Sequence, residues 1–163
     1  MTAAGESFQY ILKNLPDTEV LGRQLGQLAQ PGDVILLYGD LGVGKTTLTQ
    51  FIAQGLDVPE DQYVSSPSFA LMHEYPGRLP LFHMDCYRLA GEEDMEGAGL
   101  ADYIGGSGLT IIEWPDRLGS LQPRERLDLF LEAVDERTRT CLLRPWGAFW
   151  AARITELADL LSR

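Results

Sequence analysis

Residues 39–46 read Gly-Asp-Leu-Gly-Val-Gly-Lys-Thr, and this glycine-rich stretch lies between two segments of different periodicity. Before it, Val34–Tyr38 is a continuous apolar run, which is typical of a strand buried on both faces. After it, a helical segment extends to about Leu56. The sequence therefore predicts a buried strand whose carboxyl end leads through a tight loop into a helix N-terminus.

The stretch matches the pattern G-x-x-x-x-G-K-[ST], in which each residue type has a physical task. The glycines allow a tight turn whose successive N–H groups point inward and bind an anion. The side chain of Lys45 reaches the β- and γ-phosphates of a nucleotide, and the Thr46 hydroxyl ligates Mg²⁺. We predict a nucleotide-binding loop made of Gly39, Asp40, Leu41, Gly42, Val43, Gly44, Lys45, Thr46 and Thr47.

We expect the nucleotide to be ATP, bound with Mg²⁺. An Asn-Lys-x-Asp element would indicate guanine, but the only asparagine is Asn14, and Leu15 follows it. The absence of this element favours ATP without by itself selecting adenine.

Hydrophobic periodicity predicts further strands and helices along the chain. The expected strands are 8–12, 69–75, 79–85, 109–113, 127–134 and 138–143, and the expected helices are one that opens at Pro16-Asp17, a weak acidic one over 92–104 and one over 148–161. Segments 69–85 and 127–143 form candidate hairpins. The predicted fold is an α/β three-layer sandwich with a mixed, mainly parallel central sheet and hairpin additions, as a single domain over 1–163.

Two of the expected strands end in acids, Asp85 and Glu113. A phosphate-loop enzyme needs an acid at the end of a neighbouring strand to hold Mg²⁺, and hydrolysis needs a group that orients or deprotonates water. We assign Asp85 to the metal with Thr46, and Glu113 to the water as a catalytic residue alongside Lys45. The alternative in which Glu113 is a metal ligand stays open, as does a purely structural role for either acid.

Other polar residues near these motifs allow two interpretations each. His83 shares a strand face with Asp85 and fits either the magnesium shell or the core. The segment Ser65-Ser66-Pro67-Ser68-Phe69 is either a switch that senses the γ-phosphate or an ordinary loop. Arg88 either neutralises charge that develops at the phosphate or forms a surface salt bridge. Trp114 packs either in the core or against the site or a partner.

Charge and cysteine content exclude several other classes of function. The chain has 24 acidic and 13 basic residues, a net charge of −11, which disfavours unaided binding to nucleic acid or to an anionic membrane. Cys86 and Cys141 match no zinc-site spacing, so we expect two buried free thiols. No signal peptide or membrane-spanning run is visible in the sequence, and we expect a cytoplasmic protein.

Taken together, four segments resemble one family, the bacterial ATPase of tRNA threonylcarbamoyladenosine synthesis (the TsaE or YjeE family). They are residues 39–47, Ser66-Pro67-Ser68-Phe69, His83-Met84-Asp85-Cys86-Tyr87-Arg88-Leu89 and Glu113-Trp114-Pro115. The HxDxYRL and EWP elements are more specific than the phosphate loop. Val43 and Ser68 differ conservatively from the Ala and Thr frequent in the family, and the match fades after Pro115.

The resemblance implies a P-loop ATPase that uses ATP and Mg²⁺, with Thr46 and Asp85 on the metal and Glu113 as a catalytic carboxylate. It implies as partners a threonylcarbamoyl transferase subunit (Kae1/Qri7-like) and its paralogous, non-catalytic companion, so that tRNA is reached only indirectly. ATP hydrolysis would then reset the transferase that modifies adenosine 37 of tRNA (t6A), rather than transfer the group itself.

The resemblance also implies two nucleotide contacts outside the phosphate loop. In the family, a threonine near the start of the first helix contacts nucleotide, and Thr18 fits it. An arginine late in the chain does the same, and either Arg139 or Arg137 fits that position.

Two other functions are compatible with a phosphate loop. A small-molecule or nucleoside kinase usually needs a lid with several arginines, and between Gly55 and Glu113 the chain has only Arg78 and Arg88. A nucleotide-bound interaction module without hydrolysis is the third possibility, and the position of Glu113 argues against it only weakly.

Overall fold

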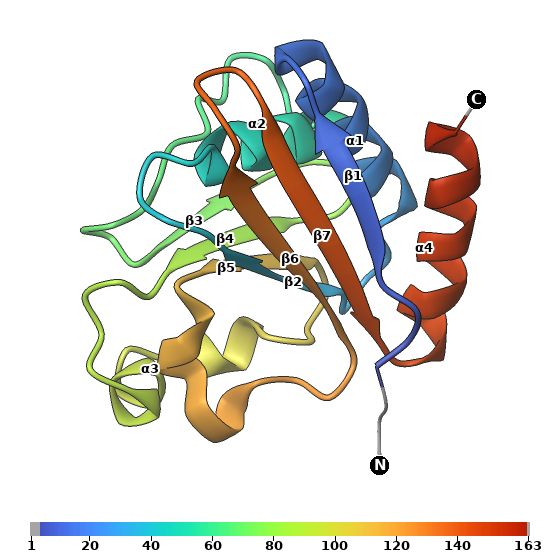
Figure 1. The fold of residues 1–163 in the computed structure, drawn as a ribbon. Helices are drawn as coiled ribbons and strands as arrows, with labels where there is room; N and C mark the ends of the chain where they lie inside the picture. Colours follow the sequence, from blue (N-terminus) through green and yellow to red (C-terminus); the bar gives the residue numbers. More distant parts are fainter. Residues whose placement is uncertain (1–3, 163) are drawn as a thin grey trace.

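A seven-stranded sheet forms the centre of the protein (Figure 1). The computed structural model describes residues 4–162. The strands lie in the order β1-β7-β6-β2-β5-β4-β3 across the sheet. Their bounds are β1 Phe8–Leu12, β2 Val34–Tyr38, β3 Met72–Tyr75, β4 Leu81–Asp85, β5 Leu109–Glu113, β6 Arg126–Ala133 and β7 Arg139–Trp146.

The sheet is parallel in the middle and antiparallel toward both edges. Strand β2 pairs in parallel with β5 and β6, and β5 pairs in parallel with β4. The pairs β1–β7, β6–β7 and β3–β4 are antiparallel. The last two are the hairpins expected from the sequence, so the predicted mixed sheet with hairpin additions is confirmed.

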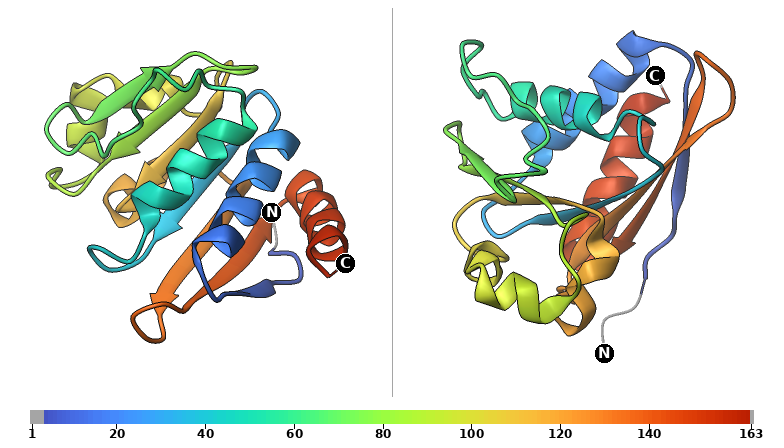
Figure 2. Two further views of the ribbon diagram at one scale, coloured as in Figure 1. Left: turned by 90° about the horizontal axis from the view of Figure 1, so that it is seen from above. Right: turned by 90° about the vertical axis from the view of Figure 1, so that its left-hand side faces the viewer.

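Helices cover both faces of the sheet and give the molecule three layers (Figure 2). One face carries α1 (Leu15–Leu28), α2 (Lys45–Gly55) and α4 (Ala148–Leu161), and the other carries α3 (Glu92–Gly97) with the 3₁₀ helices η1 (Leu100–Tyr103) and η2 (Pro115–Leu121). In β2, Ile35 and Leu37 pack in the core on the side of α1, α2 and α4. Leu36 packs in the core on the side of α3, η1 and η2. Successive strand side chains point to opposite faces, so one apolar run serves both layers.

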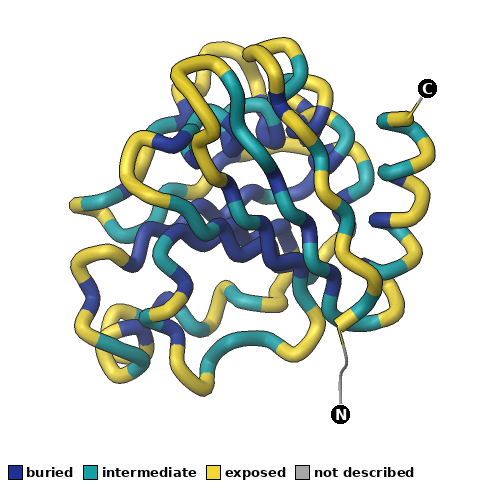
Figure 3. The backbone as a smooth tube through the Cα atoms, viewed as in Figure 1, coloured by how far each residue is buried: buried dark blue, intermediate teal, exposed yellow. Residues whose placement is uncertain are grey.

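The central strands β2, β4 and β5 are the most deeply buried part of the backbone (Figure 3). Every residue of β4 and β5 is buried, including the charged residues at their ends. Within residues 4–162, no helix is both long enough and apolar enough to cross a membrane.

Two elements differ from the sequence-based expectation. The strand expected over 69–75 begins only at Met72, because a turn closed by the Leu71 N–H on the Pro67 carbonyl, at 2.7 Å, precedes it. The acidic helix expected over 92–104 ends at Gly97 and continues as η1. The break follows from Gly99, whose φ of 74° lies in the left-handed region and cannot continue an α-helix.

Helix α1 begins where Pro16-Asp17 predicted, and Asn14 is its N-cap. The Asn14 side chain accepts a hydrogen bond from the Asp17 N–H at 2.9 Å. Glycines then bring α1 against α2: a Cβ built on Gly26 would lie 2.3 Å from the Ile52 carbonyl oxygen. Because α2 begins at the phosphate loop, this close packing sets the position of the loop's helix.

We predict that Gly26→Ala lowers the free energy of unfolding by at least about 2 kcal/mol, because the added methyl group has no room between the two helix backbones. Chemical denaturation of the purified variant measures the change. The matched control is Gly97→Ala at the end of α3, where a Cβ meets nothing within 4 Å. Equal stability changes in the two variants would contradict the proposed packing constraint.

Candidate functional site

The loop between β2 and α2 is folded tightly at one end and open at the other. Its glycines have φ values of 157° at Gly39, 80° at Gly42 and 115° at Gly44. A Cβ on Gly39 would lie 2.7 Å from Val43 Cγ1 and 2.9 Å from the Leu131 carbonyl oxygen. No atom lies within 4 Å of a Cβ built on Gly42 or Gly44. The backbone there is accessible to a ligand, as an anion-binding loop requires.

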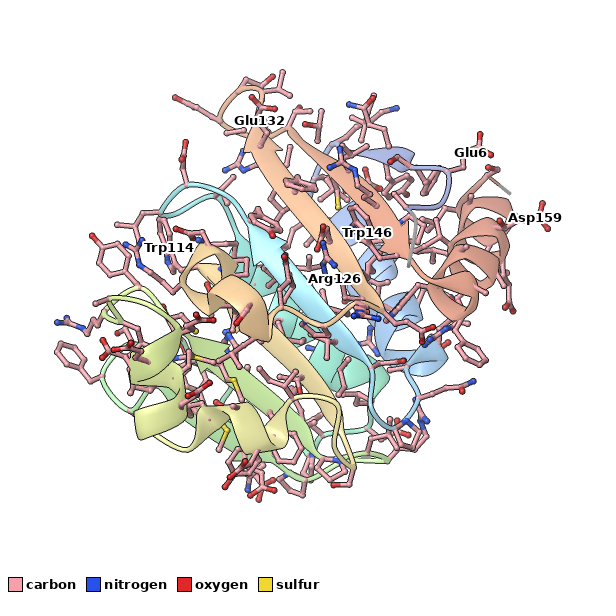
Figure 4. All side chains as sticks on the ribbon, turned by 90° about the horizontal axis from the view of Figure 1, so that it is seen from below. Glu6, Trp114, Arg126, Glu132, Trp146 and Asp159 are labelled. Atoms are coloured by element: carbon pink, nitrogen blue, oxygen red, sulfur yellow. The ribbon has the colours of Figure 1, made fainter. Side chains whose placement is uncertain are left out.

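Lys45, the first residue of α2, is held at this loop. Its Nζ donates a hydrogen bond to the Gly39 carbonyl at 2.7 Å and lies 4.1 Å from the centroid of the Trp114 ring. Figure 4 shows Trp114 beside the loop. Burial lowers the pKa of Lys45, and the negative charges of Glu113 and Asp85 oppose that shift. Nearby anions therefore offset part of the cost of burying the ammonium group.

The two predicted carboxylates are brought together by the parallel sheet. Asp85 and Glu113 are register partners on β4 and β5, and Leu37 of β2 is the partner of Glu113 on the other side. Asp85 is 4% exposed and Glu113 is 3% exposed. Both acids are therefore buried at the edge of the sheet where the parallel strands end. At the same edge, β2 leads into the phosphate loop.

Asp85 is held by groups from two further segments. The Ser66 hydroxyl donates to Asp85 Oδ2 at 2.9 Å, and the Tyr87 backbone N–H donates to Oδ1 at 2.9 Å. These two hydrogen bonds fix the orientation of the carboxylate, an oxygen ligand of the kind that a divalent cation takes. Of the two interpretations of segment 65–69, this contact favours the one that couples the segment to the site.

Glu113 is held by a different kind of partner. Its Oε2 lies 2.7 Å from Nε2 of His83, and both side chains are buried. His83 therefore contacts the Glu113 carboxylate rather than lying at a distance from it in the core. Sequence reasoning placed His83 on the right face of β4 but did not identify its partner.

A cavity of about 470 Å³ lies beside the phosphate loop and adjoins α1 and the β6–β7 hairpin. Thr18, Thr47 and Arg139 line it together with Gly42 and Gly44. Arg139 also donates from Nε to the Val43 carbonyl at 3.0 Å, which ties the hairpin to the loop. A larger cavity of about 630 Å³ is lined by α2 and the segment 57–64 and includes no phosphate-loop residue.

Arg137 and Arg88 are two further arginines that the sequence analysis considered as site residues. Arg137 also lines the cavity beside the loop, but it is exposed, and its backbone N–H bonds to Asp135. The Arg88 guanidinium lies 4.1 Å from the centroid of the exposed Phe69 ring. Arg88 thus makes a cation–π contact with Phe69, which neither interpretation from the sequence anticipated.

Trp114 is a site residue whose role the sequence left open. It has φ 57° and ψ 52°, a left-handed conformation that is uncommon for a bulky side chain. Its half-buried ring contacts the Lys45 ammonium group and lies 4.9 Å from the Tyr87 ring. The signals in the sequence were its place directly after Glu113 and its membership of the Glu113-Trp114-Pro115 element.

The donor set fits Mg²⁺ better than a metal with a full protein cage. Across residues 4–162, no group of three or more His, Cys, Asp or Glu side chains is arranged to hold a metal ion. Mg²⁺ commonly takes one or two protein carboxylates or hydroxyls and completes its shell with water and substrate phosphates. The Asp85 and Glu113 carboxylates and the Thr46 hydroxyl on the first turn of α2 are groups of that kind.

The sheet order, the strand–loop–helix unit and the buried acids define a P-loop protein of the α/β class. The sequence profile of the family described as "Threonylcarbamoyl adenosine biosynthesis protein TsaE" matches residues 12–141. The chain belongs to this family, and the resemblance seen in the sequence motifs is confirmed.

Individual relatives agree with this assignment. The tRNA threonylcarbamoyladenosine biosynthesis protein TsaE of Bacillus subtilis is 40% identical over 130 residues, covering 78% of this chain and 80% of the relative. The protein of the same name from Treponema pallidum is 36% identical over 129 residues, covering 79% and 94%. A crystal structure of Bacillus subtilis YdiB superposes with a TM-score of 0.77 at 32% identity, covering 100% of this chain and 97% of that one.

We predict that Cys86, directly after Asp85, is unreactive toward thiol reagents at pH 8 in the native protein. Burial is the main factor that raises the pKa of the Cys86 thiol to about 12, so almost none of it is the nucleophilic thiolate at pH 8. Cys141 is buried as well, and neither cysteine forms a disulfide. Titration with a chromogenic disulfide should show two reactive thiols only after denaturation, and rapid native labelling would contradict the buried placement.

Proposed function

We propose that this chain is a Mg²⁺-dependent ATPase, a P-loop ATP hydrolase, that serves the threonylcarbamoyl modification of tRNA adenosine. The observation that carries the proposal is the gathering of Lys45, Asp85 and Glu113 at one edge of the parallel sheet, beside an open phosphate loop. The family assignment and the printed names of the relatives support the pathway. The continuous sheet supports one ATPase domain over 1–163.

Each residue has a role that its surroundings support. Residues 39–47 cradle the phosphates through backbone N–H groups, and Lys45 moves from the Gly39 carbonyl to the β- and γ-phosphates. Thr46 and Asp85 hold Mg²⁺, which when bound neutralises charge on the phosphates. Thr18 and Arg139 line the side of the site that takes the rest of the nucleotide.

Glu113 orients the attacking water and accepts its proton. The water oxygen forms a bond to the γ-phosphorus while the bond from that phosphorus to the β,γ-bridging oxygen breaks, so ADP and phosphate leave. A carboxylate that is buried and held by one fixed partner is suited to this task, because little reorganisation is needed when charge develops.

The charge of the chain supports a partner-dependent action. A net charge of −11 opposes direct contact with tRNA, so the proposal assigns tRNA binding to the transferase subunit and its paralogous companion. ATP hydrolysis resets that pair and does not transfer the threonylcarbamoyl group. This division of labour is consistent with a cytoplasmic assembly.

The kinase alternative is disfavoured by the surroundings of the two arginines between α2 and β5. Arg78 donates to the Gly26 and Ala29 carbonyls near the end of α1. Arg88 stacks on Phe69. A kinase lid needs guanidinium groups free to grip phosphates, and Arg78 is committed to the fold.

We predict that Lys45→Ala weakens ATP binding at least about 10-fold, because it removes the cation that faces the phosphates. Glu113→Gln should leave ATP affinity within about 3-fold and reduce turnover about 100-fold or more, because the amide cannot accept the proton. Affinity is measured with a fluorescent ATP analogue and turnover as phosphate release, with and without the transferase pair. Unchanged turnover in Glu113→Gln, or phosphate transferred to a metabolite, would overturn the proposal.

We also predict different effects of two neighbouring arginines. Arg139→Ala should weaken ATP binding about 10-fold, because it removes the hydrogen bond to the Val43 carbonyl that holds the phosphate loop against the hairpin. Arg137→Ala, on the exposed turn of the same hairpin, is the matched control and should change affinity less than about 2-fold. The reverse order would assign the family's late arginine to Arg137.

A further inference from the structure

His83 is a buried polar residue with one polar contact. It lies in β4, its side chain is fully buried, and its Nε2 is 2.7 Å from Glu113 Oε2. The other ring nitrogen, Nδ1, is buried and has no hydrogen-bond partner within residues 4–162. A histidine that serves only the fold usually has both ring nitrogens satisfied, since an unpaired buried polar atom is unfavourable.

The chemistry of the pair defines which atom donates. An ionised carboxylate can only accept hydrogen bonds, so Nε2 carries the proton and donates it to Glu113 Oε2. Nδ1, on the other side of the ring, takes no part in this pair. The pair therefore fixes which ring nitrogen faces the carboxylate.

The same hydrogen bond gives the two carboxylate oxygens of Glu113 different surroundings. Oε2 is occupied by His83, whereas the described residues give Oε1 no hydrogen-bond partner. Asp85 differs, because both of its oxygens accept hydrogen bonds, from Ser66 and from the Tyr87 backbone. The two neighbouring acids are thus held in ways that suit different tasks.

We propose that His83 is a positioning residue that anchors Glu113 through Oε2 and leaves Oε1 as the oxygen that meets the attacking water. This inference rests on the proposed function, because it gives Glu113 the water. The register of the strands supports this proposal. His83 pairs with Ile111, two residues before the pair Asp85–Glu113, so its side chain lies on the same face of the sheet as those two acids. A buried donor at that step holds a long, rotatable side chain in one orientation.

The kinetic test compares His83→Leu with His83→Gln. The leucine variant fills the space without a donor, and glutamine can return an amide N–H close to the position of Nε2. We expect His83→Leu to lower kcat about 10- to 100-fold with KM and the Kd of a fluorescent ATP analogue within about 3-fold. We expect His83→Gln to recover most of the lost kcat. A purely structural role would lower stability and affinity without rescue by glutamine, and that result would overturn the proposal.

His73 provides the matched control. It is the register partner of His83 on the neighbouring strand β3, and its Nδ1 lies 3.1 Å from the Tyr75 hydroxyl rather than from a site residue. His73→Leu and His73→Gln should leave kcat within about 2-fold. Losses as large as those at His83 would show that any change in this hairpin disturbs catalysis, and would overturn the specific role of His83.

A double-mutant cycle separates failure of this inference from failure of the proposed function. If His83 acts through Glu113, His83→Leu should lower turnover no further in a Glu113→Gln background. Full turnover in Glu113→Gln alone would overturn the proposed function. Low turnover in Glu113→Gln with full turnover in His83→Leu, or additive losses in the double variant, would overturn only the inference about His83.

A second readout needs neither nucleotide nor turnover. The chain has two histidines, so ¹⁵N-histidine NMR of the free protein gives two ring systems, and His73→Gln assigns them. We expect a proton on Nε2 of His83, with the Nε2 resonance shifted in Glu113→Ala and unaffected in His73→Gln. An Nδ1–H tautomer, or a resonance indifferent to Glu113→Ala, would overturn the proposal even if the leucine variant fails to fold.

Discussion

The parallel pairing of β2, β5 and β4 is the constraint on which the rest of the structure depends. Parallel strands end at the same edge of a sheet, so the phosphate loop after β2 and the acids that end β5 and β4 arrive at one place. Leu37, Glu113 and Asp85 stand in register across the three strands. A shift of one residue in either pairing would turn an acid toward the opposite face, away from α2.

That edge concentrates opposite charges in a buried setting. Lys45 is 5% exposed and lies between a backbone carbonyl, the Trp114 ring and two acids. Each contact offsets part of the desolvation of the ammonium group, yet the Gly39 carbonyl and the ring are weaker partners than a phosphate. The lysine is thus held in the site without being locked by a strong ion pair. The network of Ser66, His83 and the Tyr87 N–H gives each acid its own fixed partner.

The elements that could be predicted were those with a strong local signal. The apolar runs of β2 and β5 and the loop pattern at 39–46 marked the parallel core and the nucleotide site, and Pro16-Asp17 marked the start of α1. Weak signals failed: the acidic segment after 92 breaks at Gly97, and the strand before Tyr75 is shorter than its apolar composition suggested. A turn replaces the first part of the expected strand, and the left-handed backbone of Gly99 ends the expected helix.

By itself, the sequence determined that a phosphate loop joins a buried strand to a helix, that two further strands end in acids, and that the motifs resemble one family. These are local properties, because loop conformation, strand burial and helix capping depend on residues close in the chain. Only the tertiary structure decided that His83 bonds Glu113, that Trp114 lies against Lys45, and that Arg139 ties the distant hairpin to the Val43 carbonyl. Those contacts join residues 30, 69 and 96 positions apart, and they arise from strand order and register, which no local pattern encodes.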